Sequence, residues 1–183
     1  NVENEYRSML YLEQRALNQR KAELKDMVAI AESLASIHYQ AYRQGRISQT
    51  QAQAEALSHL RQLRYNQDYG YIWVSLLAEP PTILMHPTLP EVENYYGEDP
   101  RFYQALGGQR NLLEALADIC RRQGEGYIVY NWAKPTPQGL VENQHKLSYV
   151  KLFKPWNWIL GSGVYIDDIE AEARDRKAAI VKE

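Results

Sequence analysis

The residue with the clearest potential for binding chemistry is Lys146, which lies within a predicted strand. Apart from Lys151 it is the only lysine in the predicted strands, and a lysine near the centre of a sheet is unusual unless its charge is paired. A small carboxylate bound from solution would supply such a pair through charge-assisted hydrogen bonds. A lysine at a solvated sheet edge is the alternative, and the residues alone leave both interpretations open.

A second polar group, His86, ends another predicted strand and is followed by Pro87. Because a proline restricts the residue before it and cannot donate a ladder hydrogen bond, the backbone around His86 is constrained. The imidazole could donate a hydrogen bond to a carboxylate or carbonyl oxygen of a ligand. It could equally be a polar strand-end residue bonded to a loop carbonyl.

Two pairs of aromatic residues could form the walls of an anion pocket. Tyr71 and Trp73 are two residues apart in one predicted strand, and Tyr130 and Trp132 are two apart in another, so each pair shares a face. Aromatic walls exclude water, and phenol hydroxyls add hydrogen-bond donors. Ordinary core packing is the common alternative for such residues. With Lys146 and His86 added, these four aromatic residues make up the candidate ligand site.

Other kinds of site find little support in the sequence. His38, His59 and His145 have no partner at metal-ligand spacing, so neither a metal nor a cofactor is expected. The single cysteine, Cys120, lies in a predicted helix, and no nucleophile has a nearby base, which disfavours a small hydrolase. The formal net charge of −2, with no basic run, argues against a nucleic-acid partner.

The elements that must position these residues fall into two compositional zones. Residues 1 to 64 contain no proline, tryptophan or phenylalanine, whereas all eight prolines lie between residues 80 and 155. Apolar residues at heptad spacing predict one long helix over 3–44, part of which packs against another chain. Gly45 suits a left-handed helix end, and Ser48 with Gln51 suits the capping box of a second helix that ends near Arg64.

Beyond residue 70 the apolar pattern becomes strand-like. Strands are predicted at 71–77, 82–86, 126–132, 144–153 and 158–165, with a helix at 110–123 and an exit helix after Asp167. Short connections between consecutive strands favour an antiparallel sheet. The predicted fold is α+β, a PAS-like five-stranded antiparallel sheet with a long N-terminal helix across one face. We expect one structural domain made of a helical part (1–66), the sheet (67–166) and the exit helix (167–183).

A series of short segments carries a family resemblance. The segments are Tyr71-Ile72-Trp73-Val74, Met85-His86-Pro87, Pro90-Glu91-Val92-Glu93, Gly124-Glu125-Gly126-Tyr127, Tyr130-Asn131-Trp132, Lys134-Pro135, Lys146-Leu147-Ser148-Tyr149-Val150-Lys151, Phe153-Lys154-Pro155-Trp156-Asn157-Trp158 and Gly161-Ser162-Gly163-Val164-Tyr165-Ile166-Asp167-Asp168. In this order they resemble the single-Cache sensor domains of the sCache_2 branch, over most of the chain from about Met27 onward.

Two segments depart from that family pattern. The first hairpin turn is Ala78-Glu79-Pro80-Pro81, where the family commonly carries an aspartate and a glycine. The segment before the inserted helix is Glu98-Asp99-Pro100 leading to Gly107-Gly108, in place of the usual Asp-x-x-Gly element. These departures leave the identity of the ligand open.

The resemblance implies an extracytoplasmic ligand-binding sensor domain, the periplasmic or extracellular part of a bacterial membrane protein such as a chemoreceptor or sensor kinase. It implies a small carboxylate ligand such as acetate, propionate, pyruvate or lactate, with Lys146 in a family motif, and no catalysis. The implied partners are a second copy through the N-terminal helix, flanking transmembrane helices and a cytoplasmic output domain. We therefore expect the chain to be a piece of a longer protein. A structural dimerisation domain that has lost its ligand is the alternative.

Overall fold

The computed structural model describes residues 1–182. Asn1 is the N-cap of helix α1 (Val2–Arg43), because its side chain accepts a hydrogen bond from the backbone N–H of Glu3. Just beyond the other end of the helix, Gly45 has the left-handed conformation (φ +74°). Ser48 is the N-cap of α2 (Gln49–Gln62), because its hydroxyl accepts a hydrogen bond from the backbone N–H of Gln51. Both helices, the helix end at Gly45 and the Ser48 N-cap are therefore confirmed. The predicted capping box is only half formed, because the Gln51 side chain donates to Glu55.

The sheet has the predicted five antiparallel strands, in the order β4-β3-β7-β6-β5. They are β3 (Trp73–Leu76), β4 (Thr82–Met85), β5 (Glu125–Thr136), β6 (Gly139–Phe153) and β7 (Trp158–Tyr165). The hairpin of β5 and β6 is longer than predicted and continues through Pro135. A proline is tolerated there because β5 is an edge strand, and its outer side forms no ladder hydrogen bonds that need a backbone N–H. Only residues 137 and 138 separate the two strands.

The first predicted strand, 71–77, is divided in the structure. Its start forms β2 (Gly70–Tyr71), which pairs with β1 (Arg64–Tyr65) in a separate two-stranded sheet. The excursion after β4 contains a short 3-10 helix (Pro90–Val92), α3 (Pro100–Gln104) and α4 (Leu112–Gln123). Helix α4 starts two residues later than predicted because Asn111 is its N-cap and accepts the amide of Leu113. A second 3-10 helix (Lys154–Trp156) joins β6 to β7.

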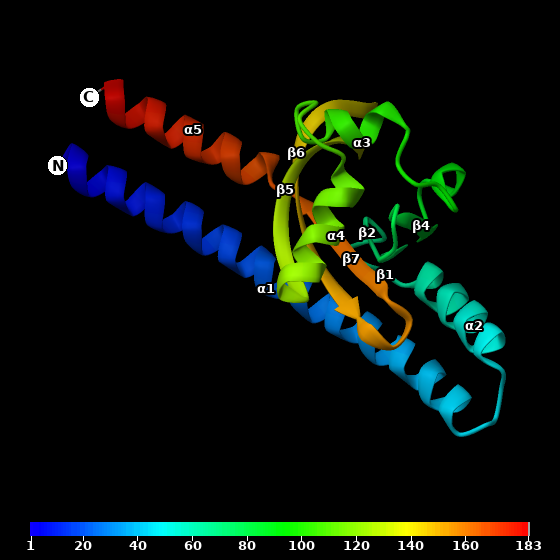
Figure 1. Ribbon diagram of the computed structural model, residues 1–183. Coiled ribbons are helices and arrows are strands. Elements are labelled where there is room, and N and C mark those ends of the chain that lie inside the picture. The colour runs from blue at the N-terminus through cyan, green and yellow to red at the C-terminus, as the bar shows by residue number, and fades with distance from the viewer. Residues whose placement is uncertain (183) are drawn as a thin grey trace.

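Two apolar clusters cover the two faces of the sheet, and strand alternation divides the side chains between them. Helices α1 and α2 pack on one face, where Leu24 and Val28 of α1 meet Val74 of the sheet. Helices α3 and α4 cover the other face, where Trp73 of β3 belongs to the cluster. In Figure 1 the long α1 crosses behind the sheet while α4 lies in front of it. The candidate aromatic residues all lie on the α4 side.

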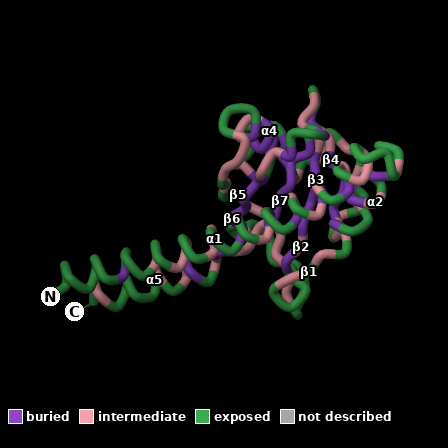
Figure 2. The backbone as a smooth tube through the Cα atoms, turned by 90° about the horizontal axis from the view of Figure 1, so that it is seen from below, coloured by how far each residue is buried: buried purple, intermediate pink, exposed green. Residues whose placement is uncertain are grey.

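The exit helix α5 (Asp167–Lys182) runs beside the first half of α1, and both termini lie at the same end of the molecule (Figure 1). This pair of helices extends away from the body and is mostly exposed (Figure 2). Among the helices of residues 1–182, none combines the length and apolar character that crossing a bilayer requires. The sheet is therefore connected to both chain ends through one helical arm.

Candidate ligand-binding site

Lys146 lies in the interior of β6, where its register partners are Tyr130 of β5 and Tyr165 of β7. The residue is only 3% exposed. Its Nζ donates a hydrogen bond of 3.0 Å to the Tyr71 hydroxyl. The same nitrogen lies 4.9 Å from the ring centroid of Tyr71, 5.4 Å from that of Tyr165 and 5.7 Å from that of Trp73. The structure thus excludes a solvated edge lysine.

The charge on this lysine has no counter-ion among residues 1–182. Among residues 1–182, no carboxylate forms an ion pair with Lys146, although the other ion pairs of the chain are numerous. Burial acts to lower the pKa of Lys146, but Tyr71, Tyr130 and Tyr165 outweigh it and hold the pKa above its ordinary value. A buried ammonium surrounded by ring faces and hydroxyls is an incomplete electrostatic arrangement, since a buried charge is costly without a partner. A small anion would complete it.

His86 follows β4 and lies beside this cluster, with its ring centroid 5.3 Å from that of Tyr71. Its Nδ1 accepts the amide of Leu89 at 3.1 Å. The alternative expected His86 to hydrogen-bond a loop carbonyl, whereas the structure shows a hydrogen bond from a loop N–H. Burial, and then the charge of Lys146, lower the pKa of His86 to about 3. The ring is therefore neutral with its proton on Nε2, and within residues 1–182 that N–H has no hydrogen-bond partner.

The second aromatic pair extends the wall of the site toward α3. Tyr130 is 6% exposed, and its hydroxyl hydrogen-bonds the Ser148 hydroxyl at 2.9 Å. The ring of Trp132 lies 6.0 Å from that of Tyr130 and 5.8 Å from that of Phe102 on α3. The structure therefore gathers Tyr71, Trp73, His86 and Tyr130 around the lysine, whereas Trp132 lies one ring farther out.

Three residues of the site were missed by the sequence reasoning. Tyr165 contributes a ring face to Lys146, and Ser148 orients the Tyr130 hydroxyl. Gly163 provides the space for Ser148 and Lys146, because a Cβ there would overlap the Ser148 hydroxyl and lie 2.8 Å from Cε of Lys146. Strand alternation from Gly163 places Tyr165 on the same face, so this signal was present in the sequence.

The histidines require one correction. His38 and His59 were expected to have no partner at ligand spacing, but the packing of α1 on α2 brings His38 Nε2 and His59 Nδ1 to 2.9 Å. The nearest carboxylate, that of Glu55, is 3.7 Å from His38 Nδ1. Within residues 1–182 no group of three or more potential ligands is arranged for a metal ion.

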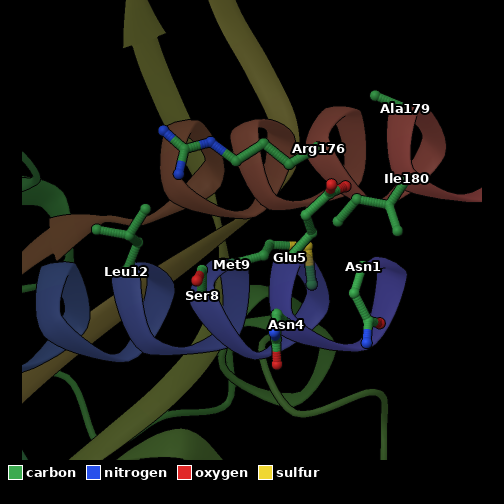
Figure 3. Close-up of a pocket in the computed structure, with 9 residues that line it drawn as sticks. All are labelled: Asn1, Asn4, Glu5, Ser8, Met9, Leu12, Arg176, Ala179 and Ile180. Carbon is green, nitrogen blue, oxygen red and sulfur yellow. The ribbon is translucent and has the colours of Figure 1, made fainter.

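Two further features, Cys120 and a hollow between two helices, could also hold a site. Burial raises the pKa of the Cys120 thiol to about 12, which leaves it protonated and unreactive. A separate hollow of about 380 Å³ lies between the ends of α1 and α5 and is lined by residues such as Met9 and Ile180 (Figure 3). Its one cation, Arg176, is already paired with Glu172 on the same helix. The Lys146 cluster is therefore the stronger candidate for a ligand site.

The amino-acid sequence of this chain is similar to those of bacterial chemotaxis proteins. The protein named methyl-accepting chemotaxis protein McpP of Pseudomonas putida is 37% identical over 157 residues, which are 85% of this chain and 27% of that protein. Methyl-accepting chemotaxis protein CtpM of Pseudomonas aeruginosa is 28% identical over 91% of this chain and 28% of that protein. The chain thus spans about a quarter of the length of these curated relatives.

Solved structures share the fold. One, described as the structural basis for carboxylic acid recognition by a Cache chemosensory domain, has a TM-score of 0.71 and 32% identity, covering 84% of this chain and 98% of that one. A periplasmic sensor domain of a chemotaxis protein has a TM-score of 0.72 and 32% identity, covering 84% and 99%. A family model for a Cache domain, dCache_2 rather than the sCache_2 branch that the segments resembled, matches residues 1–183. The chain therefore belongs to the Cache family of sensor domains.

Proposed function

We propose that this chain is the extracytoplasmic ligand-binding domain of a transmembrane signal transducer, a chemoreceptor or sensor kinase, and that it binds a small monocarboxylate. Acetate, propionate, pyruvate and lactate are the candidate ligands. The observation that carries the proposal is the buried Lys146 ammonium, which no carboxylate of residues 1–182 neutralises. It disfavours the alternative of a purely structural domain, because burying a cation without a partner weakens a fold.

The groups around Lys146 fit a carboxylate. The Tyr71 hydroxyl accepts from Lys146, so its own proton is available to a ligand oxygen. His86 offers its Nε2–H in the same region. A carboxylate accepts up to about four hydrogen bonds, and these three donors would satisfy most of that capacity. Aromatic rings enclose the donors and strengthen their electrostatic attraction for the anion by excluding water.

The number of free cations favours one carboxylate over two. Arg61 and Arg101 are the other cations that influence His86. Arg61 is paired with Glu93 at 2.6 Å, and Arg101 is paired with Asp99 at 2.8 Å. A second carboxylate of a ligand would therefore be buried against aromatic rings without a free cation, which is unfavourable.

Thermal unfolding with a panel of C2 to C4 acids tests the ligand class. A bound monocarboxylate at about 100 times its Kd stabilises the folded state by about 2.7 kcal/mol, which raises the Tm by roughly 5–10 °C in a chain of this size. The matched controls are acetamide and propionamide, which keep the shape of the acids without the charge. We expect no shift with either amide, and equal shifts with acid and amide would contradict a site built around Lys146.

We also propose that a second copy of the chain covers an apolar stripe on α1. Ile30 is 52% exposed and Ile37 is 63% exposed. Together with partly buried positions they form a heptad stripe that runs beside the face of α1 that packs on the sheet, with Leu34 also touching that core: Met27, Ile30, Leu34, Ile37 and Ala41. Spacings of three and four residues are those of a coiled-coil seam between helices. A receptor with paired copies would then meet the membrane through two helical arms.

A double substitution tests this interface. Ile30→Glu with Ile37→Glu places four like charges along the seam of a dimer, so we expect dimerisation to weaken by at least about 100-fold. Sedimentation equilibrium over a concentration series measures the effect. Ala29→Glu is the control, since this exposed residue lies on α1 outside the stripe. A wild-type chain that stays monomeric at millimolar concentration would contradict the interface.

A further inference from the structure

Tyr165 connects the candidate ligand site to the helical arm. It is the last residue of β7, and its ring lies 5.4 Å from the Lys146 ammonium. Its hydroxyl donates to the carbonyl of Ala133 on β5 at 2.5 Å. Its carbonyl accepts from Nη1 of Arg20, on α1, at 2.7 Å. One residue thus contacts the buried cation, the edge strand and the N-terminal helix.

The Arg20 guanidinium also holds the beginning of the exit helix. Nη1 and Nη2 of Arg20 donate to the two carboxylate oxygens of Asp168 at 2.7 and 2.5 Å. This fork geometry fixes the angle between the partners as well as their distance, which a single ion pair does not. The clamp formed by Arg20, Asp168 and the Tyr165 carbonyl therefore joins α1 to α5 at the point where both leave the sheet.

Two further tethers hold the same end of α5 to strands of the site. Nζ of Lys134 is 3.0 Å from both carboxylate oxygens of Asp167, and Lys134 follows Trp132 by two residues in β5. His145, the neighbour of Lys146 in β6, contacts Glu170 of α5 at 2.8 Å. The first turn of α5 is thus held by residues that lie next to members of the Lys146 cluster in β5 and β6.

We propose that the clamp of Arg20, Asp168 and the Tyr165 carbonyl transmits occupancy of the Lys146 site to the exit helix. This inference rests on the proposed function. An anion bound at Nζ of Lys146 competes with the Tyr165 ring for the positive charge of that lysine. This competition changes the position that Tyr165 favours. Because the carbonyl of Tyr165 shares the Arg20 guanidinium with Asp168, that change alters how α5 is held against α1. Arg20 and Asp168 are positioning residues in this scheme and do not touch the ligand.

The test compares ligand binding with the response of α5 in the same chain. Hydrogen exchange of residues 167–182 is measured with and without saturating propionate, and calorimetry measures propionate affinity. In the wild type we expect propionate to change α5 amide protection by about 5-fold or more. In Asp168→Asn and in Arg20→Gln we expect that change to be lost while affinity stays within about 10-fold. Glu172→Gln is the control, because Glu172 pairs with Arg176 inside α5.

Each outcome supports or overturns the coupling. Propionate binding by the wild type without any change in α5 overturns the clamp and leaves the proposed function intact. An unaltered α5 response in both Asp168→Asn and Arg20→Gln also overturns it. Absence of binding by all four candidate acids, acetate, propionate, pyruvate and lactate, to the wild type overturns the proposed function together with the clamp. Using two variants on different helices guards against misfolding of either one, which circular dichroism detects.

Discussion

Replacing Lys146 with methionine is expected to weaken carboxylate binding by at least about 30-fold. Truncating one partner of a buried, hydrogen-bonded charge pair costs about 2–5 kcal/mol, and each 1.4 kcal/mol is a factor of ten in affinity. Methionine retains the apolar length of the lysine stem, so the rings of Tyr71, Trp73 and Tyr165 keep a neighbour to pack against. Titration calorimetry with acetate or propionate measures the loss.

The same substitution makes a second prediction for the empty protein. If Lys146 serves chiefly a ligand, the variant keeps the free energy of unfolding of the wild type to within about 1.5 kcal/mol, because methionine retains the packing of the lysine stem. If Lys146 served only to hold the Tyr71 hydroxyl, the variant would instead be less stable. Denaturant unfolding without ligand separates the two roles.

Lys151→Met provides the matched control. Lys151 lies in the same strand as Lys146 but is paired with Glu32 of α1 at 3.1 Å. That contact lies on the opposite face of the sheet, as strand alternation requires. We expect this variant to bind carboxylates as the wild type does. Equal binding by Lys146→Met and the wild type would remove Lys146 from the site.

Strand alternation made much of the site predictable from the sequence. Placing Tyr71 with Trp73, and Tyr130 with Trp132, requires only that each segment be a strand, because the side chains then divide between two faces. The same rule places Tyr149 on the face opposite Lys146, and the structure has Tyr149 in the cluster that packs against α1. Helix ends at Gly45 and Ser48 followed from cap chemistry that is local in sequence.

What the sequence could not provide were contacts between elements far apart in the chain. The clamp joins Arg20 to Asp168, and no periodicity relates residues 148 positions apart. The pairing of His38 with His59 depends in the same way on how α1 packs against α2. The protonation of His86 likewise depends on Leu89 folding back to donate to Nδ1. Local patterns thus identify the groups of this site, whereas tertiary packing determines their charge and connection.

His86 makes the stability of the empty protein sensitive to acid. Its pKa is lowered to about 3 in the folded chain by burial and by nearby positive charge, against an ordinary value of 6.5. Below that ordinary value the unfolded chain binds a proton that the folded chain does not, so stability falls as the pH falls. By pH 4.5 this one group is expected to cost roughly 2.7 kcal/mol, and the loss continues down to about pH 3.

Comparison with His86→Gln isolates this contribution, because glutamine does not titrate while carboxylates and His38 titrate in both chains. Between pH 7.5 and 4.5 the free energy of unfolding measured in urea should fall by roughly 2–3 kcal/mol more in the wild type than in the variant.

A bound carboxylate should raise the pKa of His86. In the empty site the charge of Lys146 helps to lower this pKa, and the charge of the carboxylate offsets that of Lys146. By linkage, carboxylate affinity should then rise as the pH falls toward 5, and in His86→Gln this dependence should be lost. A parallel pH profile for the two chains would show that His86 does not face the ligand.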